Sequence, residues 1–237
     1  MYEYDKVKGG LFGLLIGDAL GVPYEFYEKE YIPSKNLIEF EPPSGFKKTY
    51  EDVKSGTWSD DGAQALCLFE SLIKNNRLDM NDFSNELIQW YDHGKWAVDN
   101  YVFDVGMQTE NALILCKKGI SPLKSGFVNP EGKGNGSLMR VLPLVLWHKG
   151  SDYELVLDAH KQSLVTHGHI CNQVCCAFYC VTGREILKGR DFNKAYRNAV
   201  IKMRNLYKDM KIYETEFESV IKPDEEMSGK GTGYVVD

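Results

Sequence analysis

The sequence lacks an excess of positive charge and a long unbroken hydrophobic run. Its 237 residues include 28 lysines and arginines against 34 aspartates and glutamates, which gives a net charge of -6. Binding to the nucleic-acid backbone needs a basic face, so this balance argues against nucleic acid as the principal ligand. The apolar stretch 11–20 is interrupted by Gly13, Gly17 and Asp18 and is too short to span a bilayer.

The sequence also lacks a secretory signal and a disulfide framework. The first residues, 1–6, are polar and charged and do not have the basic and then apolar pattern of a signal peptide. Four of the six cysteines fall within 171–180 of a helical pattern, which suits reduced thiols better than disulfides. The spacing of His167, Cys171 and Cys175 allows a zinc interpretation, but one helix face rarely supplies four tetrahedral ligands. We therefore expect a cytoplasmic protein whose cysteines are buried and structural.

Strand patterning is weak, even in the stretch 31–40, and helical periodicity accounts for most of the chain. Apolar residues recur at helical spacing, and the sequence predicts helices over 6–20, 60–75, 82–93, 106–118, 138–148, 152–165, 170–188 and 192–207. Glycines at 94, 119, 150 and 189 follow helical segments, where a left-handed C-cap favours glycine. The glycine-rich segment 6–20 reads as a buried central helix that a neighbouring backbone approaches closely. We predict one all-α domain covering 1–237.

A pair of acids opens the second predicted helix, in the sequence Trp58-Ser59-Asp60-Asp61. Ser59 or Asp60 could simply cap the helix, since a cap needs one such side chain. Two adjacent carboxylates and a hydroxyl exceed that need, and the acids repel each other even at the positive end of a helix dipole. A hard divalent cation would resolve the repulsion, because Mg²⁺ and Mn²⁺ prefer carboxylate and hydroxyl oxygens. Cap and metal site both remain open from these residues alone.

Three further polar clusters interrupt the helical patterns. Asp18 and Glu25 flank a turn that contains proline, and an acid at a helix end is usually solvated or capping. The loop 132–137 is rich in glycine and runs towards a predicted helix, whose free amides would accept phosphate oxygens, although it lacks the Gly-Lys-Ser/Thr ending of a Walker loop. His167 lies at a break between two helical patterns, where a lone histidine is more often structural than catalytic.

Taken in order, these clusters resemble the ADP-ribosylglycohydrolase family, which includes the dinitrogenase-reductase-activating glycohydrolases. The matching motifs are Gly17-Asp18-Ala19-Leu20-Gly21 with Glu25, Trp58-Ser59-Asp60-Asp61, Asp104-Val105-Gly106 with Thr109, Gly134-Asn135-Gly136 with Met139-Arg140, Thr166-His167, and Gly231-Thr232-Gly233-Tyr234. Each motif is weak by itself, and the ordered combination is highly specific. The resemblance implies an all-α fold, a single-domain orthogonal helical bundle, in agreement with the helical pattern.

The resemblance implies a binuclear Mg²⁺ or Mn²⁺ site that serves hydrolysis of N- or O-glycosidic bonds to ADP-ribose. Ser59, Asp60 and Asp61 match metal ligands, with Ser59 where the family usually has threonine. Glu25, Asp60 and Asp61 are the candidate catalytic carboxylates. The positions matching substrate contacts are Asp104, Asn135, Gly136, Ser137, Met139 and His167. The implied substrate is an ADP-ribosylated protein or a small ADP-ribose conjugate, and we expect no nucleic-acid or membrane partner.

The chain departs from the family pattern at its end. The family's Asp-x-Asp-Thr loop, which supplies the other metal ligands, has no counterpart after residue 61. We therefore expect a C-terminally truncated domain in which the second half-site is absent. The apolar ending Tyr234-Val235-Val236 leads us to expect an uncovered surface that favours self-association or a partner chain. Two functions stay open: a metal-dependent hydrolase, and a non-catalytic ADP-ribose-binding module. A helical protein with no ligand would leave the clusters unexplained.

Overall fold

The computed structural model describes residues 4–224, and in this range every regular element is helical. The α-helices are α1 (Tyr4–Gly21), α2 (Asp60–Asn75), α3 (Met80–His93), α4 (Met107–Lys117), α5 (Leu142–Trp147), α6 (Asp152–Leu164), α7 (Ile170–Leu187), α8 (Phe192–Tyr207) and α9 (Lys211–Glu216). The predicted all-α class is confirmed. The apolar ending and the motif at 231–234 lie outside the described residues.

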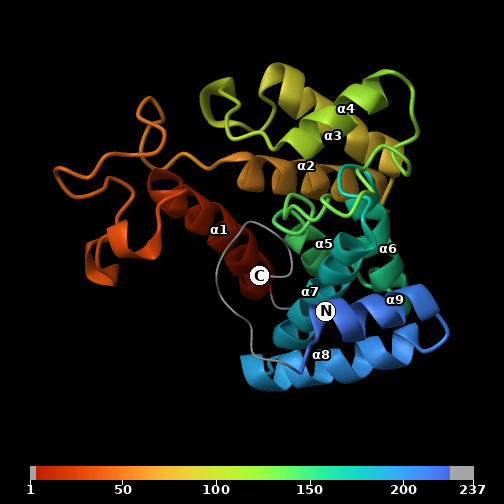
Figure 1. Cartoon of the computed structure of the whole chain (residues 1–237). Coiled ribbons are helices and arrows are strands. Elements are labelled where there is room, and N and C mark those ends of the chain that lie inside the picture. Colours follow the sequence, from red (N-terminus) through yellow and green to blue (C-terminus); the bar gives the residue numbers. More distant parts are fainter. Residues whose placement is uncertain (1–3, 225–237) are drawn as a thin grey trace.

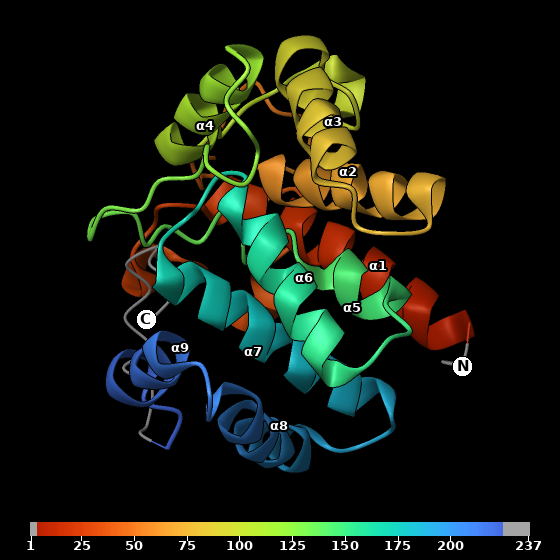
Figure 2. The ribbon, with the colours of Figure 1, turned by 90° about the vertical axis from the view of Figure 1, so that its right-hand side faces the viewer.

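The helices form stacked layers, with α2, α3 and α4 at one end, α5, α6 and α7 in the middle and α8 and α9 at the other end (Figures 1 and 2). Helix α7 is central, because it packs against α5, α6, α8 and α9. Helix α2 packs against α1, α3 and α5, so it joins the upper layer to the middle one. No helix within 4–224 is long and apolar enough to cross a membrane.

The amphipathic pattern explains the burial of α2 and α8. In α2 the buried side chains Ala63, Cys67 and Leu68 lie on the face that meets α3 and α5. In α8 Ala199 and Met203, four residues apart, are fully buried, while Arg197 and Arg204 are exposed. All six cysteines are free, and five of them are buried.

Helix α1 is not the buried central helix that its glycines predict. Its only buried residue is Ala19, and Phe12 and Ile16 are each about half exposed, at 51% and 52%. Only Gly10 is approached closely, by the side chain of Leu146, while Gly13 has no neighbour within 4 Å of the space a Cβ would take. The physical reason is that apolar residues surround the whole helix, and α2 and α5 cover one side of it.

Two other details differ from the sequence prediction. Helix α5 begins at Leu142 instead of 138, because successive turns occupy 138–141 and Pro143 then stands in the first helical turn. Gly94, Gly119 and Gly189 have positive φ as expected, but Gly150 does not. Gly150 lies directly before Ser151, which caps α6 in a capping box with Glu154, and a Cβ at Gly150 would meet the Glu154 carboxylate. Helix α9 was not predicted, because six residues give little periodicity.

Candidate functional site

The carboxylate of Asp18, near the end of α1, binds the start of α2. Its two oxygens accept hydrogen bonds from Ser59 N at 3.1 and 3.0 Å, from Ser59 Oγ at 2.8 Å and from Gly62 N at 2.8 Å. A Cβ on Gly62 would lie 2.9 Å from Asp18 Oδ2. The first two acidic clusters of the sequence therefore form one site, and a side chain at position 62 would force Asp18 and its neighbours to shift.

Ser59 is the N-cap of α2, since its Oγ accepts from Asp61 N at 3.3 Å. The cap and the acidic site therefore coexist at this helix start. Asp60 is 5% exposed, and its Oδ2 accepts from Gln64 Nε2 at 2.9 Å, one turn further along α2. The positive end of the helix dipole favours these acids, although it cannot offset several of them.

Glu25 and Asp104 complete an acidic cluster with Asp18, Asp60 and Asp61. Burial, followed by the charge and hydrogen bond of Asp104, raises the pKa of Glu25 to about 8. Burial and then repulsion by Asp18 and Asp104 raise the pKa of Asp61 to about 7. The pKa of Asp60 is raised well above its ordinary value, first by burial and then by the Asp61 charge. The five carboxyl groups therefore act on one another through repulsion that protons or a cation would relieve.

The donor chemistry of this cluster fits a hard divalent cation, because carboxylates with raised pKa values lie beside the Ser59 hydroxyl. The arrangement is nevertheless incomplete as a cage. Within residues 4–224 no three His, Cys, Asp or Glu side chains come together closely enough to hold a metal ion. Ser59, Asp60 and Asp61 are thus positioned as part of a ligand set.

The loop 132–137 packs against His167. A Cβ on Gly136 would lie 2.6 Å from His167 Cε1, and Gly134 O accepts from Asn172 Nδ2 at 2.6 Å. The imidazole is 3% exposed, and its Nδ1 is 2.8 Å from Thr166 Oγ1. Burial, and then the Arg140 charge, lower the pKa of His167 to about 3, so the ring is neutral at physiological pH.

Side chains of the remaining predicted substrate positions differ in exposure. Asn135 is exposed, and its carbonyl accepts from the backbone N–H groups of Leu138 and Met139. Ser137 is fully buried beneath the loop, where its Oγ lies 2.8 Å from Ser163 Oγ. Met139 is half-buried. Because α5 begins at Leu142, the loop does not lead directly into a helix N-terminus as the sequence predicts. The contact of the loop with phosphate stays a prediction.

The structure adds Gln64 and Tyr50, which the motifs did not single out, and it gives the contacts of Arg140, which belongs to one of the motifs. Gln64 and the fully buried Arg140 link the acidic cluster to this loop through hydrogen bonds. The i, i+4 spacing of Asp60 and Gln64 was the available signal for Gln64. Tyr50 also belongs here, because burial, then a hydrogen bond with Asp104, raise its pKa.

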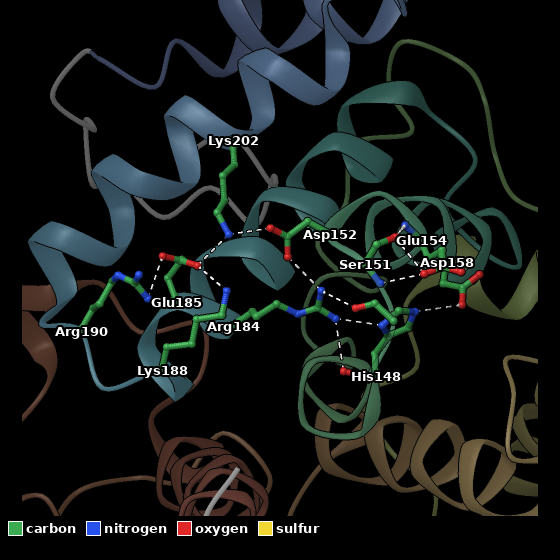
Figure 3. Close-up of polar contacts among 11 residues, drawn as sticks. His148, Ser151, Asp152, Glu154, Asp158, Arg184, Glu185, Lys188, Arg190 and Lys202 are labelled. Atoms are coloured by element: carbon green, nitrogen blue, oxygen red, sulfur yellow. Dashed lines mark hydrogen bonds and ion pairs between the residues drawn. The ribbon is translucent and has the colours of Figure 1, made fainter. Parts of the chain in front are cut away.

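A second polar network lies at the other end of α7, around Arg184 (Figure 3). This guanidinium donates to Asp152 Oδ1 at 2.9 Å, to Gly150 O at 3.0 Å and to His148 O at 3.2 Å. A cavity of about 910 Å³ borders the network, between Lys6 on α1 and Lys188 at the end of α7. Asp152 at the start of α6 pairs with Arg184 in α7, so the network joins these two helices.

Comparisons with known proteins identify the family and the fold of the chain. The family model described as ADP-ribosylglycohydrolase matches residues 2–237. A relative named ADP-ribosylarginine hydrolase Tri1, from Serratia proteamaculans, is 32% identical over 98% of this chain and 60% of its own length. The ADP-ribosyl-[dinitrogen reductase] glycohydrolase of Rhodospirillum rubrum is 26% identical over 99% of this chain and 71% of its own length. A solved structure titled ADP-ribosylglycohydrolase-related protein complex has a TM-score of 0.66 and 25% identity over 98% of this chain and 71% of that one. The chain spans about three fifths of the length of Tri1.

Proposed function

The chain belongs to the ADP-ribosylglycohydrolase family, and we propose on that basis that it hydrolyses the glycosidic bond between ADP-ribose and a modified protein side chain. The observation that carries the proposal is the convergence of Asp18, Glu25, Asp60, Asp61 and Asp104 from separate segments of the chain. Such a concentration of repelling acids is unfavourable for stability and is typical of a functional site.

We assign distinct roles to the carboxylates. Cleavage at the anomeric carbon of the distal ribose develops positive, oxocarbenium-like charge, which neighbouring carboxylates stabilise. Without a cation, burial and the neighbouring acids raise the pKa of Glu25 to about 8, and this carboxyl is the group that would exchange a proton with the reacting groups. Ser59, Asp60 and Asp61 would hold Mg²⁺ or Mn²⁺. A bound divalent cation would offset the carboxylate charge and help to orient the ribose hydroxyls.

Arginine is the first linkage to test, because the relative at 32% identity is named an ADP-ribosylarginine hydrolase. The loop 134–137 and His167 would contact the ribose and diphosphate. The neutral His167 ring would contribute shape and hydrogen bonding, since its pKa of about 3 leaves it uncharged. Asp104 lies among the acids, and we therefore place it nearer the reacting ribose than the nucleotide base.

A second candidate function is a non-catalytic ADP-ribose-binding module. It is favoured by the fact that the described residues bring together no group of three side chains able to enclose a metal ion. The two candidates differ in a direct assay. Protein carrying ADP-ribosyl-arginine is incubated with the chain and Mn²⁺ or Mg²⁺, and released ADP-ribose is measured together with ADP-ribose affinity.

Release that is lost in Asp60→Ala but retained in the matched control Asp92→Ala would exclude the binding module. Binding of ADP-ribose without release would instead exclude the hydrolase for this chain alone. Metal ligation by the acids predicts at least about tenfold weaker Mn²⁺ binding in the Asp60→Ala, Asp61→Ala double variant. Unchanged affinity would contradict that ligation. Sedimentation of the purified chain would test self-association, with a stable monomer as the opposing result.

A further inference from the structure

Arg140 is a fully buried arginine, and no carboxylate within residues 4–224 pairs with it. Its guanidinium donates from Nη1 to Gln64 Oε1 at 2.8 Å, from Nε to Gln162 Oε1 at 3.3 Å and from Nη2 to Gln162 O at 3.1 Å. The aromatic ring of Phe83 lies beneath it, 5.2 Å from Cζ to the ring centroid. Buried charges are usually paired directly, so this choice of neutral partners needs a reason.

The reason lies in the polarity of the groups. A guanidinium is only a donor, whereas a glutamine amide has one acceptor end and one donor end. With its Oε1 held by Arg140, Gln64 must turn its Nε2 towards Asp60 Oδ2, which accepts at 2.9 Å. Gln162 is oriented in the same way, and its Nε2 donates to Ser137 O at 3.1 Å. One guanidinium thereby imposes the direction of two buried amides.

We propose that Arg140 is a positioning residue that acts through Gln64 and Gln162 on both halves of the site. Through Gln64 it presents a donor to one oxygen of Asp60, which keeps that carboxylate an acceptor in a single orientation. Through Gln162 it holds the backbone of the loop 134–137 at Ser137. The contacts through Gln64 and through Gln162 together fix the position of the acidic cluster relative to the loop. This inference rests on the proposed function for its purpose, although the orientation of the amides does not.

Arg184 provides an internal contrast (Figure 3). It is also buried, at 4% exposed, but it is paired with Asp152 at 2.9 Å. Arg184 therefore donates directly to a carboxylate, with no glutamine amide between them. Arg140, by comparison, passes its donor character through Gln64 to Asp60. Replacing Gln64 by glutamate would satisfy Arg140 better than the wild-type residue, yet would turn an acceptor towards Asp60.

Exchanging the donor and the acceptor at residues 64 and 60 tests, without ligand, whether Arg140 orients Asp60 through Gln64. In Gln64→Glu the new carboxylate can pair with Arg140 but faces the Asp60 carboxylate. Adding Asp60→Asn restores a donor and acceptor pair, because the asparagine amide can donate to the glutamate. Urea unfolding of wild type, the two single variants and the double variant measures whether the effect of Asp60→Asn on stability depends on residue 64. Gln173→Glu, at another buried glutamine whose amide contacts Gly168 O and Tyr213, is the control background.

We expect Asp60→Asn to lower the unfolding equilibrium constant at least about tenfold more in the Gln64→Glu background than in the wild type or in Gln173→Glu. Equal effects in all three backgrounds would overturn the proposal that Arg140 orients Asp60 through Gln64. Should Gln64→Glu fail to fold, recovery of a folded protein in the double variant is the same positive result. A double variant that also fails to fold would overturn it.

Mn²⁺ titration tests the functional consequence separately. If wild type binds Mn²⁺, Gln64→Met should bind it at least about tenfold more weakly, while Gln173→Met should match wild type. Equal affinity in Gln64→Met would overturn the positioning role. If wild type binds no Mn²⁺, the proposed cation site fails, and the unfolding experiment still decides whether the amide direction of Gln64, which Arg140 holds, orients Asp60. Repeating the pair of unfolding measurements in an Arg140→Met background should abolish the difference between the two residue-64 backgrounds, and an unchanged difference would overturn the role of Arg140.

Discussion

Replacing Gly136 by alanine should destabilise the protein through a clash with His167. An ideal Cβ at Gly136 lies 2.6 Å from His167 Cε1 and 3.0 Å from Nε2. Carbon atoms in favourable contact are about 3.5–4.0 Å apart, so the ring or the loop must shift by about 1 Å. The imidazole is 3% exposed and is held at Nδ1 by Thr166 Oγ1 at 2.8 Å. Overpacking of such a site costs about 1–3 kcal/mol.

Urea unfolding of Gly136→Ala measures this cost, and ADP-ribose titration measures its effect on the loop. Gly13→Ala is the matched control, because a Cβ at Gly13 meets nothing within 4 Å and its exposed position lies within helix α1. Replacing a helical glycine by alanine should raise stability by about 0.5–1 kcal/mol. The two identical chemical changes should therefore have opposite signs.

The same substitution in a His167→Ala variant shows whether the loss of stability comes from the clash with the imidazole. In His167→Ala the atoms that Gly136 would strike are gone, so the further change Gly136→Ala should cost little. A neutral effect of Gly136→Ala in the wild type would refute the packing argument. An equally large loss in the His167→Ala background would refute it as well, because the cost would then come from the loop backbone.

Three other outcomes follow from the contacts. Asp18→Ala removes an acceptor of hydrogen bonds from Ser59 and Gly62, so the free energy of unfolding should fall by about 1–3 kcal/mol. Urea unfolding that shows no loss would mean that relief of acidic repulsion outweighs these hydrogen bonds. The pKa of Glu25 is raised from 4.5 to about 8 in the folded chain. Between these two pH values the folded chain therefore keeps a proton that the unfolded chain has already released. Stability should therefore be greatest at the acidic end of that range and fall as pH rises to about 8, and Glu25→Gln should flatten the fall; an unchanged slope in that variant would assign the effect to other groups. Arg184→Met should cost about 1–3 kcal/mol, because it removes the hydrogen bonds to Gly150 O and His148 O while Asp152 keeps Lys202 as a partner. The release of ADP-ribose per folded molecule should stay at the wild-type value, and a loss of that specific activity would mean that this network reaches the site.

Local patterns in the sequence determined much of the fold. The boundaries of α2 and α8 follow from caps and amphipathic periodicity, which depend on neighbours a few residues away. The acidic start of α2 was also visible, as was the ordered set of motifs that identifies the family. Ser59 was expected either as a cap or as a metal-site residue; the structure confirms the cap, and metal ligation stays a prediction.

Only the tertiary structure decided which faces are covered and which polar groups meet. The apolar residues of α1 predicted burial, but burial depends on how many neighbours pack around a helix, and in the described residues one side of α1 stays open. The contact between Gly136 and His167 joins residues 31 positions apart, and Arg140 reaches Gln64 across 76 positions. No local pattern encodes such pairings, because they arise when separate helices pack. The sequence therefore determined the helices and the acids, and the packing of α2 against α1 and α5 determined the site that those acids form.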